Sequence, residues 1–232
     1  MIFLESTHFF VRTVAFEFVN RDPAVRLRFR LMPMIHVGSA QYYEQVFDYL
    51  NECDEVLYEG VRSKKRSFSS YYFKWVAKRL GLVSQTEALP LRKLKGRLIH
   101  ADYSQKENEQ QIALLSTKER LYMRMVLPFR RILDLRESIQ SRAMLAKCFM
   151  TSAEDAYRAY GPVRDEPGTY ENYLLHQREQ IVFDHIRQKM RTETALPKLV
   201  GIIYGAGHMD AIARYLIDQY HFVPAEGRFF RA

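Results

Sequence analysis

Three of the seven histidines in this 232-residue chain stand where a run of apolar residues ends and a turn or helix begins. They are His36, His100 and His208, and a fourth run of this kind ends in an acid, Glu59. Imidazole and carboxylate groups move protons near neutral pH and bind divalent metals. If the four runs are strands of one parallel sheet, these side chains meet at its carboxyl edge, where open α/β sheets bind ligands. The pattern therefore predicts a functional site as well as a fold.

The elements that would position these residues alternate between strand and helix patterns. Residues 9–19 and 25–35 flank a turn signal at 20–23 and predict a hairpin. A helical pattern at 39–51, with Ser39 as N-cap, leads to a short apolar strand at 55–59. The order strand, helix, strand predicts a βαβ unit with a parallel pair of strands and a right-handed crossover.

The second half of the chain repeats this arrangement after a long helical stretch. A helix is expected at 71–80 and a strand at 97–101, and residues 104–159 show helical patterns without convincing strand signals. A second βα unit then closes the chain. Its expected elements are helices at 169–191 and 209–219, a buried strand at 198–204, and a short strand or hairpin involving 222–223 and 228–230.

Together these patterns predict an α/β fold with a central, mostly parallel sheet flanked by helices. We expect one domain over residues 1–232, with a helical cap inserted at about 104–160 between the two βα halves. The Leu-, Met- and Arg-rich part of this cap, residues 116–150, also suits a basic amphipathic surface that touches a membrane. Packing over the sheet is the commoner role for such helices, and it is our interpretation.

Composition narrows the functional class. The chain is 47% apolar and 27% charged, which is ordinary for a soluble globular protein, and no apolar run is long enough for a transmembrane helix. No secretory leader pattern opens the sequence, and Cys53 and Cys148 lie in unrelated contexts. We therefore expect a cytoplasmic protein with reduced thiols and no stable membrane insertion.

The formal charge of +8 raises the question of nucleic-acid binding. The basic residues are spread along the chain at spacings that suit solvated helix faces, and no nucleic-acid motif accompanies them. We therefore expect a small-molecule or peptide substrate, no nucleic-acid partner, and possible assembly into a homo-oligomer. A basic nucleic-acid binder is the least favoured alternative, and it predicts steeply salt-dependent retention of DNA or RNA.

Gly205-Ala206-Gly207-His208 is the sharpest local motif. Glycines between a strand and a helix let another group approach the backbone closely, and the helix that follows suits an anion. Gly205 and Gly207 are thus candidate substrate-binding residues. A dinucleotide fingerprint would need a third glycine where Asp210 stands. A tight strand–helix connection without a ligand explains the motif equally well.

The other candidates each have a structural alternative. Glu59 at a strand end also suits a helix cap or a salt bridge, and His36 also suits a hydrogen-bonded core position. His100 and Asp102 share one face of an extended segment in His-Ala-Asp, a pair that recurs by chance. The prediction of a site depends on the convergence of these positions. Arg62, in the basic, serine-rich stretch after Glu59, is a further candidate for substrate contact.

Taken together, these motifs resemble the TraB/PrgY/GumN/TIKI superfamily, whose fold is related to ChaN and the erythromycin esterases. The resemblance consists of two Gly-x-x-His-type motifs, one near each end of the domain, and an acid after the first. The matching segments are Pro33–Gly38 followed by Tyr42-Tyr43, Val56–Glu59, His100–Asp102, Gln177–Glu179, and Gly205–His208. They extend the resemblance over nearly the whole chain, from about residue 9 to residue 223.

The resemblance implies a divalent-metal-dependent hydrolase, possibly a peptidase of TIKI type. His36, Glu59 and His208 would hold Mn²⁺, Co²⁺ or Zn²⁺, which lowers the pKa of bound water and polarises a carbonyl. His100 or Asp102 would move protons, and Arg178 would orient a carboxylate or stabilise an oxyanion.

One departure from the family pattern leads to an alternative function. Pro33 stands in place of the family's first glycine, where proline fixes φ and removes an N–H. If that position contacts substrate, the substitution predicts a protein that binds a ligand but no longer cleaves it. The alternative function is therefore a non-catalytic or regulatory protein that holds an anionic or haem-like ligand in the same place.

Overall fold

The computed structural model describes the chain except for residues 7–10, 61–73, 76, 127–168, 170–171 and 196. Its centre is a seven-stranded sheet in the order β1-β2-β3-β8-β5-β7, with β9 paired to β2 outside this path. The strands are β1 Leu4–Ser6, β2 Val11–Asn20, β3 Arg28–Met34, β5 Glu55–Tyr58, β7 Arg97–His100, β8 Leu199–Gly205 and β9 Phe222–Arg231. A separate small sheet pairs β4, Val37–Gly38, with β6, Val83–Ser84.

All strands of the large sheet except β2 point in the same direction. β2 is antiparallel to β1, β3 and β9, while β3, β8, β5 and β7 are mutually parallel neighbours. This arrangement confirms the predicted mixed α/β fold with a mostly parallel central sheet. The predicted hairpin is also confirmed, because Phe16 and Phe18 of β2 pair with Leu31 and Phe29 of β3.

The predicted βαβ unit needs one correction. β3, α1 (Ala40–Leu50) and β5 follow each other in the chain, but the two strands are not neighbours, because β8 lies between them. β8 is buried along nearly its whole length, as a central parallel strand covered on both faces must be. Its Leu, Val and Ile residues supply the apolar surface that this central place requires.

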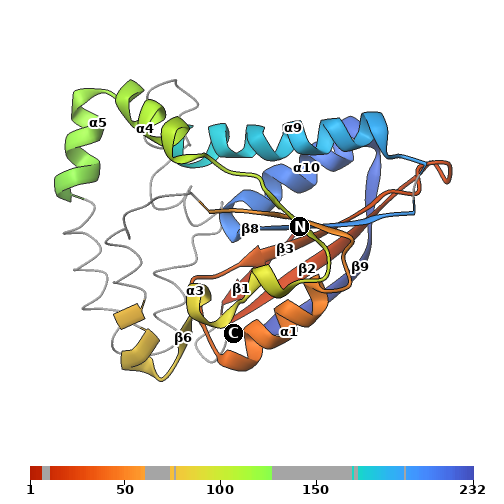
Figure 1. Cartoon of the computed structure of the whole chain (residues 1–232), viewed down its shortest axis with the longest axis horizontal. Helices are drawn as coiled ribbons and strands as arrows, with labels where there is room; N and C mark the ends of the chain where they lie inside the picture. The colour runs from red at the N-terminus through yellow and green to blue at the C-terminus, as the bar shows by residue number, and fades with distance from the viewer. Residues whose placement is uncertain (7–10, 61–73, 76, 127–168, 170–171, 196) are drawn as a thin grey trace.

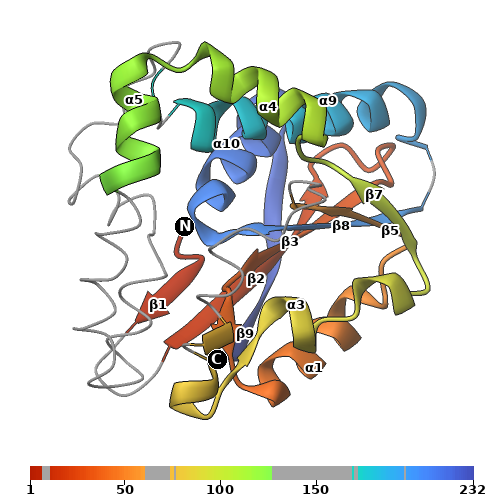
Figure 2. The same cartoon turned by 60° about the vertical axis from the view of Figure 1, so that its left-hand side comes forward.

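Helices cover both faces of the sheet (Figures 1 and 2). α1 lies on one face, while α9 and α10 lie on the other. Ser39 caps α1 as predicted, since its hydroxyl accepts a hydrogen bond from the backbone amide of Tyr42 at 3.1 Å. The remaining helices are α3 Gln85–Ala88, α4 Gln105–Leu114, α5 Thr117–Leu121, α9 Gln177–Thr192 and α10 Met209–Tyr220, with 3-10 turns at Leu91–Lys93 and Ala206–His208 and π-helical turns at Tyr122–Val126 and Asn172–His176.

The two faces of the sheet form two hydrophobic cores. The first packs α1 against side chains such as Met32, Val56 and Ile203, and all three are buried. The second packs α9 and α10 against the alternate residues of the same strands, among them Leu57 and Ile202. Because successive strand residues face opposite sides, each parallel strand contributes to both cores. This alternation also decides the face to which each residue at the carboxyl edge belongs.

The C-terminal segment forms a longer strand than the sequence indicated. β9 runs for 10 residues along β2 and passes through Pro224 and Gly227. Proline is tolerated because β9 pairs with β2 only, so the missing N–H need not break a second ladder. A register shift opposite Glu17 and Phe18 absorbs one extra β9 residue, Ala225, as a bulge.

The predicted helical cap is described only in part. α4 begins with a capping box between Ser104 and Glu107, and α5 and the π-helical turn follow it. The rest of the predicted insertion, from residue 127 onward, lies outside the described residues, as do Arg62 and Cys148. Of the helix predicted at 71–80, residues 74–75 and 77–80 are described and helical, and the helix stops before Gly81, whose φ is 65°. No helix in the described ranges is long and apolar enough to span a bilayer.

Gly96 gives a first stability prediction. A Cβ at this position would lie against the backbone carbonyl of Cys53 and 3.0 Å from that of Asp54. These carbonyls belong to the chain entering β5 and cannot move without disturbing the Arg97 N–H bond to Asp54. We expect Gly96→Ala to lower the free energy of unfolding by about 1–3 kcal/mol, measured by urea denaturation. Lys95→Ala, at an exposed neighbouring position, should change it little.

Candidate functional site

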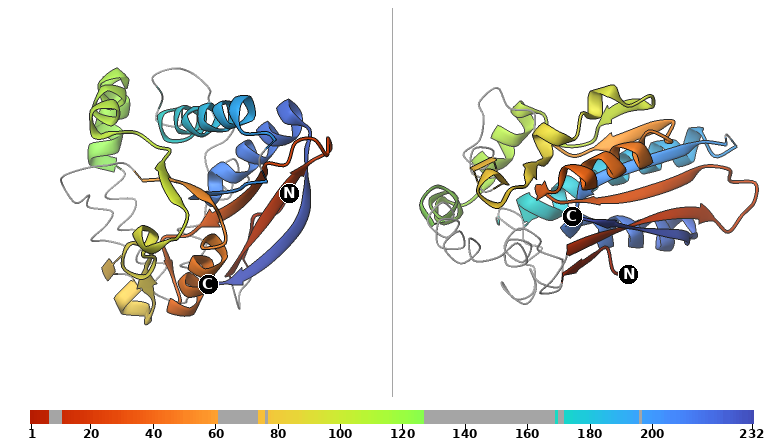
Figure 3. Two further views of the ribbon diagram at one scale, coloured as in Figure 1. Left: turned by 45° about the vertical axis from the view of Figure 1, so that its right-hand side comes forward. Right: turned by 90° about the horizontal axis from the view of Figure 1, so that it is seen from below.

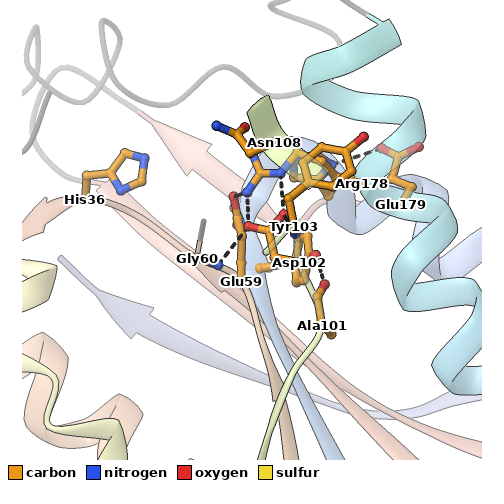
Figure 4. Close-up of polar contacts among 12 residues, drawn as sticks. His36, Glu59, Gly60, Ala101, Asp102, Tyr103, Asn108, Arg178 and Glu179 are labelled. Atoms are coloured by element: carbon orange, nitrogen blue, oxygen red, sulfur yellow. Dashed lines mark hydrogen bonds and ion pairs between the residues drawn. The ribbon is translucent and has the colours of Figure 1, made fainter. Parts of the chain in front are cut away.

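The residues singled out from the sequence follow the parallel strands at one edge of the sheet. His36 comes two residues after β3, Gly205 ends β8, Glu59 directly follows β5, and Asp102 lies two residues beyond β7. The strand order β3-β8-β5-β7 therefore brings together groups that are far apart in the chain. Figure 4 shows this edge, with Arg178 reaching it from α9.

Arg178 is the centre of the polar network. Its Nε donates to Oδ1 of Asp102 at 2.9 Å, and its Nη2 donates to Oδ2 of Asp102 and to Oε1 of Glu59, each at 2.6 Å (Figure 4). The Arg178 side chain is 11% exposed, that of Glu59 20%, and that of Asp102 fully buried. A bidentate pair of this kind fixes the plane of the guanidinium. The network thus holds Arg178 rigidly at the sheet edge.

Asp102 is saturated by hydrogen bonds. Besides Arg178, the backbone amide of Gly60 donates to its Oδ2 at 2.9 Å and that of Tyr103 to its Oδ1 at 2.8 Å. A carboxylate that accepts four hydrogen bonds and has no exposed surface is a poor proton carrier. In this structure Asp102 orients Arg178, and the proton-moving role that the family resemblance implied remains a prediction.

Glu59 connects the Arg178 guanidinium to the backbone of the glycine motif at the end of β8. Its Oε1 accepts from Arg178, and its Oε2 accepts from the backbone amide of Gly205. A Cβ on Gly205 would lie 3.3 Å from that oxygen, so the glycine allows the close approach. The anion that the glycine motif was expected to attract is therefore a carboxylate of the protein itself. Gly207 lies in the 3-10 turn that follows.

The charge state of Glu59 follows from its neighbours. Burial alone would raise the pKa of the Glu59 carboxyl, but the Arg178 guanidinium, the His208 ring and the Gly205 amide outweigh it, so the pKa lies below its ordinary value. Burial likewise opposes the charge on Arg178, yet Glu59 and Asp102 keep its pKa above the ordinary value. Glu59 and Arg178 are therefore a charged pair at neutral pH.

His208 is held by a carboxylate that the sequence analysis did not assign. Its Nδ1 lies 3.1 Å from Oε1 of Glu179, and both side chains are almost completely buried. Because a carboxylate only accepts, Nδ1 carries the proton of this hydrogen bond, and in the neutral form of the ring the lone pair is then on Nε2. The ring also packs edge-on against Tyr204, and its Cδ2 lies 3.7 Å from the Cβ position of Gly205. His208 therefore lies on the same side of the sheet edge as Glu59.

Two nitrogen atoms at this edge are available to a ligand. Within the part of the chain that the structure describes, neither Nη1 of Arg178 nor Nε2 of His208 has a hydrogen-bond partner. Both side chains are largely buried, with 6% of His208 and 11% of Arg178 exposed. Nη1 offers N–H donors, and both residues interact with the Glu59 carboxylate, Arg178 by a hydrogen bond and His208 electrostatically.

His36 lies at the same edge but apart from the network. Its side chain is exposed, and its Nδ1 lies 3.2 Å from Oε1 of Gln85 at the start of α3. Figure 4 shows its ring separated from Arg178, with Glu59 between them. The His36 ring still lowers the pKa of Glu59, so the two groups interact electrostatically.

His100 faces the opposite side of the sheet. Its ring packs against Tyr58, its register partner on β5, with ring centroids 5.3 Å apart. Tyr58 belongs to the α1-side core, whereas Leu57 and Ile99 belong to the core under α9 and α10. The Nε2 of His100 donates to the carbonyl of Gly60 at 2.6 Å. The structure therefore does not bring His100 together with Arg178 and His208.

The metal ligands implied by the resemblance, His36, Glu59 and His208, remain a prediction. Among the described residues, no group of three or more His, Cys, Asp or Glu side chains is arranged to hold a metal ion. Both oxygens of Glu59 already accept hydrogen bonds, one of them from a cation. A divalent ion bound by Glu59 would be repelled by the Arg178 guanidinium beside it.

Glu179 could have been found from the helix pattern alone. It lies on the buried stripe of α9 with Val182, Ile186 and Lys189, at positions where apolar residues are expected. An acid in such a stripe needs a polar partner across the interface. The sequence could not identify that partner, because His208 lies 29 residues further along the chain.

The fold and this edge define a mixed α/β protein with a buried Arg–carboxylate network beside a carboxylate-bound histidine. Comparison with protein-family models, curated proteins and solved structures gives no match for this chain.

Proposed function

We propose that this protein is a hydrolase that cleaves a carbonyl compound, a small molecule or a peptide, at the carboxyl edge of the sheet. One observation carries the proposal: among the described residues, Nε2 of His208 and Nη1 of Arg178 have no hydrogen-bond partner, while the other polar side-chain atoms of Arg178, Asp102 and Glu59 are occupied. A base and an N–H donor held side by side are the two groups that water attack on a carbonyl requires.

His208 is the proposed base. The Glu179 carboxylate accepts the hydrogen bond of the Nδ1 proton and holds the ring in a fixed orientation, and Nε2 has no partner among the described residues. A water molecule next to Nε2 gives up its proton as it attacks the carbonyl carbon. Glu179 then stabilises the imidazolium that forms, and the same ring returns the proton to the leaving group. Glu179 acts through His208 and is a positioning residue.

Arg178 is the proposed oxyanion donor. Its Nη1 has no hydrogen-bond partner among the described residues, while the rest of the guanidinium is fixed by Asp102 and Glu59. Negative charge that develops on the carbonyl oxygen is thereby met by a donor that needs no reorganisation. Three carboxylates, those of Glu59, Asp102 and Glu179, lie beside Arg178 and His208, which favours a neutral reacting group over an anionic one. Membership in the TraB/PrgY/GumN/TIKI superfamily is part of the proposal and agrees with this reaction class.

Hydrolysis of a panel of chromogenic esters and short peptides tests the proposal. We expect turnover by the wild-type protein and a loss of about 10²–10⁴-fold in kcat for His208→Ala, the usual contribution of a general base. His221→Asn, at the left-handed residue that follows α10, is the matched control and should keep full activity. The absence of turnover on every substrate, or equal activity of His208→Ala, would contradict the proposal.

A metal-dependent form of the same hydrolase is the second candidate. It is favoured by the carboxylate behind His208, since metal-ligating histidines usually donate their other ring N–H to such a group. In this form Nε2 of His208 would hold Mn²⁺, Co²⁺ or Zn²⁺, and the ion would lower the pKa of bound water. Metal content and activity after chelation separate the two candidates. Activity that survives EDTA supports the base mechanism, while loss and recovery on adding Mn²⁺ supports the metal.

A further inference from the structure

The outer edge of β9 has no partner strand. β9 pairs with β2 along one side, and among the described residues no strand pairs with its other side. Figure 3 shows β9, in dark blue, along the rim of the sheet. Such an edge exposes backbone N–H and C=O groups that another strand can pair with, unless the chain protects it.

The hydrogen-bond pattern identifies which backbone groups point outward. The amide of Ala232 donates to the carbonyl of Val11, so residue 232 faces β2, and the register continues through Arg231 opposite Arg12. In an antiparallel pair, residues alternate between facing the partner and facing away. The backbone groups of Gly227, Phe229 and Arg231 therefore point away from β2.

The two halves of β9 differ in protection. In the first half, Pro224 lies opposite Phe18 at an outward-facing position, where it offers no N–H, and the bulge at Ala225 interrupts the edge. In the second half, the three outward-facing residues all carry amides. The segment from Gly227 to Arg231 is thus a regular edge that no proline or bulge interrupts and with which no described strand pairs.

We propose that this segment pairs with the same segment of a second copy of the chain, antiparallel and about a twofold axis at Phe229. Outward-facing residues must lie opposite each other for their hydrogen bonds to form. With the axis at Phe229, Gly227 lies opposite the second copy's residue 231, Phe229 lies opposite its own equivalent, and every outward group is paired. An axis at Arg228 would place two arginines directly opposite each other and put Arg231 opposite Ala225, the bulge residue.

The side chains favour the same register. Phe229 is 57% exposed although it lies in a regular strand, and the Arg12 guanidinium lies over its ring at 4.3 Å. At the twofold axis the two Phe229 rings lie on the same face of the continued sheet and remove each other from water. An aromatic cross-strand pair of this kind stabilises an antiparallel ladder.

Phe229→Pro is the sharpest variant to test the proposal, because it removes both the outward-facing amide and the exposed ring at the axis and leaves the β2–β9 hydrogen bonds in place. By sedimentation equilibrium up to about 1 mM, a range chosen because small interfaces bind weakly, we expect wild-type mass to rise from one chain toward two. Phe229→Pro should stay at one chain with unchanged thermal stability. Wild-type protein that remains one chain throughout, or a Phe229→Pro variant that dimerises equally, overturns the proposal.

Disulfide formation between two copies tests the register by a measurement that does not depend on a loss of dimerisation. In the proposed pairing the two residues 229 face each other across the axis at about 5.5 Å between Cα atoms, within reach of a disulfide. Phe229→Cys should therefore form a covalent dimer under mild oxidation. Glu226→Cys, on the other face and away from the axis, should not. Equal cross-linking of the two variants would reject this register.

Discussion

Arg178→Ala is expected to lower the free energy of unfolding by about 3–5 kcal/mol, the usual cost of breaking a buried ion pair from one side. The substitution leaves the carboxylates of Glu59 and Asp102 close together at the sheet edge without their cation. Asp102 keeps two backbone donors and Glu59 keeps one, but neither replaces the charge of the guanidinium. Chemical denaturation followed by circular dichroism measures the loss.

The pH dependence of this loss has a defined sign. The pKa of Glu59 is lowered in the folded protein, so its contribution to stability is full above the unfolded value of about 4.3 and disappears as pH falls through the folded value. When Glu59 is protonated in acid, the wild type loses the stabilisation from the Glu59–Arg178 ion pair. The Arg178→Ala variant has no such ion pair, so its stability changes less. The stability difference between Arg178→Ala and the wild type should therefore shrink below about pH 4.

A combined variant separates charge from packing. Arg178→Met together with Glu59→Gln and Asp102→Asn removes all three charges while nearly preserving side-chain volume. If the loss in Arg178→Ala comes from unpaired carboxylates, the combined variant should be clearly more stable than Arg178→Ala. Equal instability of the two would show that the packing of the arginine stem matters more than its charge. The hydrolytic activity proposed above should be absent from both.

Glu55→Ala is expected to have an effect of similar size at the opposite edge of the sheet. Glu55 begins β5, and its carboxylate forms ion pairs with Lys189 of α9 and with Lys198, the latter at 2.9 Å. The side chains of Glu55 and Lys189 are 8% and 6% exposed. Without Glu55, the buried ammonium keeps only Glu193, at 3.5 Å, as a partner. We expect a loss of about 3–5 kcal/mol in urea denaturation.

Glu193→Gln is the natural control for Glu55→Ala, because Glu193 belongs to the same cluster but is 24% exposed. Glu193→Gln should lower the free energy of unfolding much less than Glu55→Ala does. Burial raises the pKa of Glu55, but Lys189 and Lys198 together lower it by more than burial raises it. The pKa in the folded protein therefore lies below its ordinary value. The Glu55 contribution is therefore present above about pH 4.3 and disappears in acid, as for Glu59. A Glu55→Ala variant as stable as Glu193→Gln would contradict this account.

Much of the fold could be predicted from local patterns. Ser39 followed by Tyr42, Tyr43 and Val46 at helical spacing gave the start and buried face of α1 correctly. The run ending at Tyr204 gave β8, and the turn at residues 20–23 gave the β2–β3 hairpin. These elements depend on capping, periodicity and turn chemistry, which are properties of neighbouring residues.

The arrangement of the site depended on pairings that no local pattern contains. The sequence by itself placed polar residues at the ends of apolar runs, and this was enough to predict that the strands before His36, Glu59, His100 and His208 end at one edge. Only the tertiary structure decided that β8 lies between β3 and β5, and this brings the Gly205 amide to Glu59. It also decided that His100 turns to the α1 side and that Glu179 meets His208. The physical reason is that strand order and helix docking are set by how the two cores pack, through contacts between residues more than 100 positions apart.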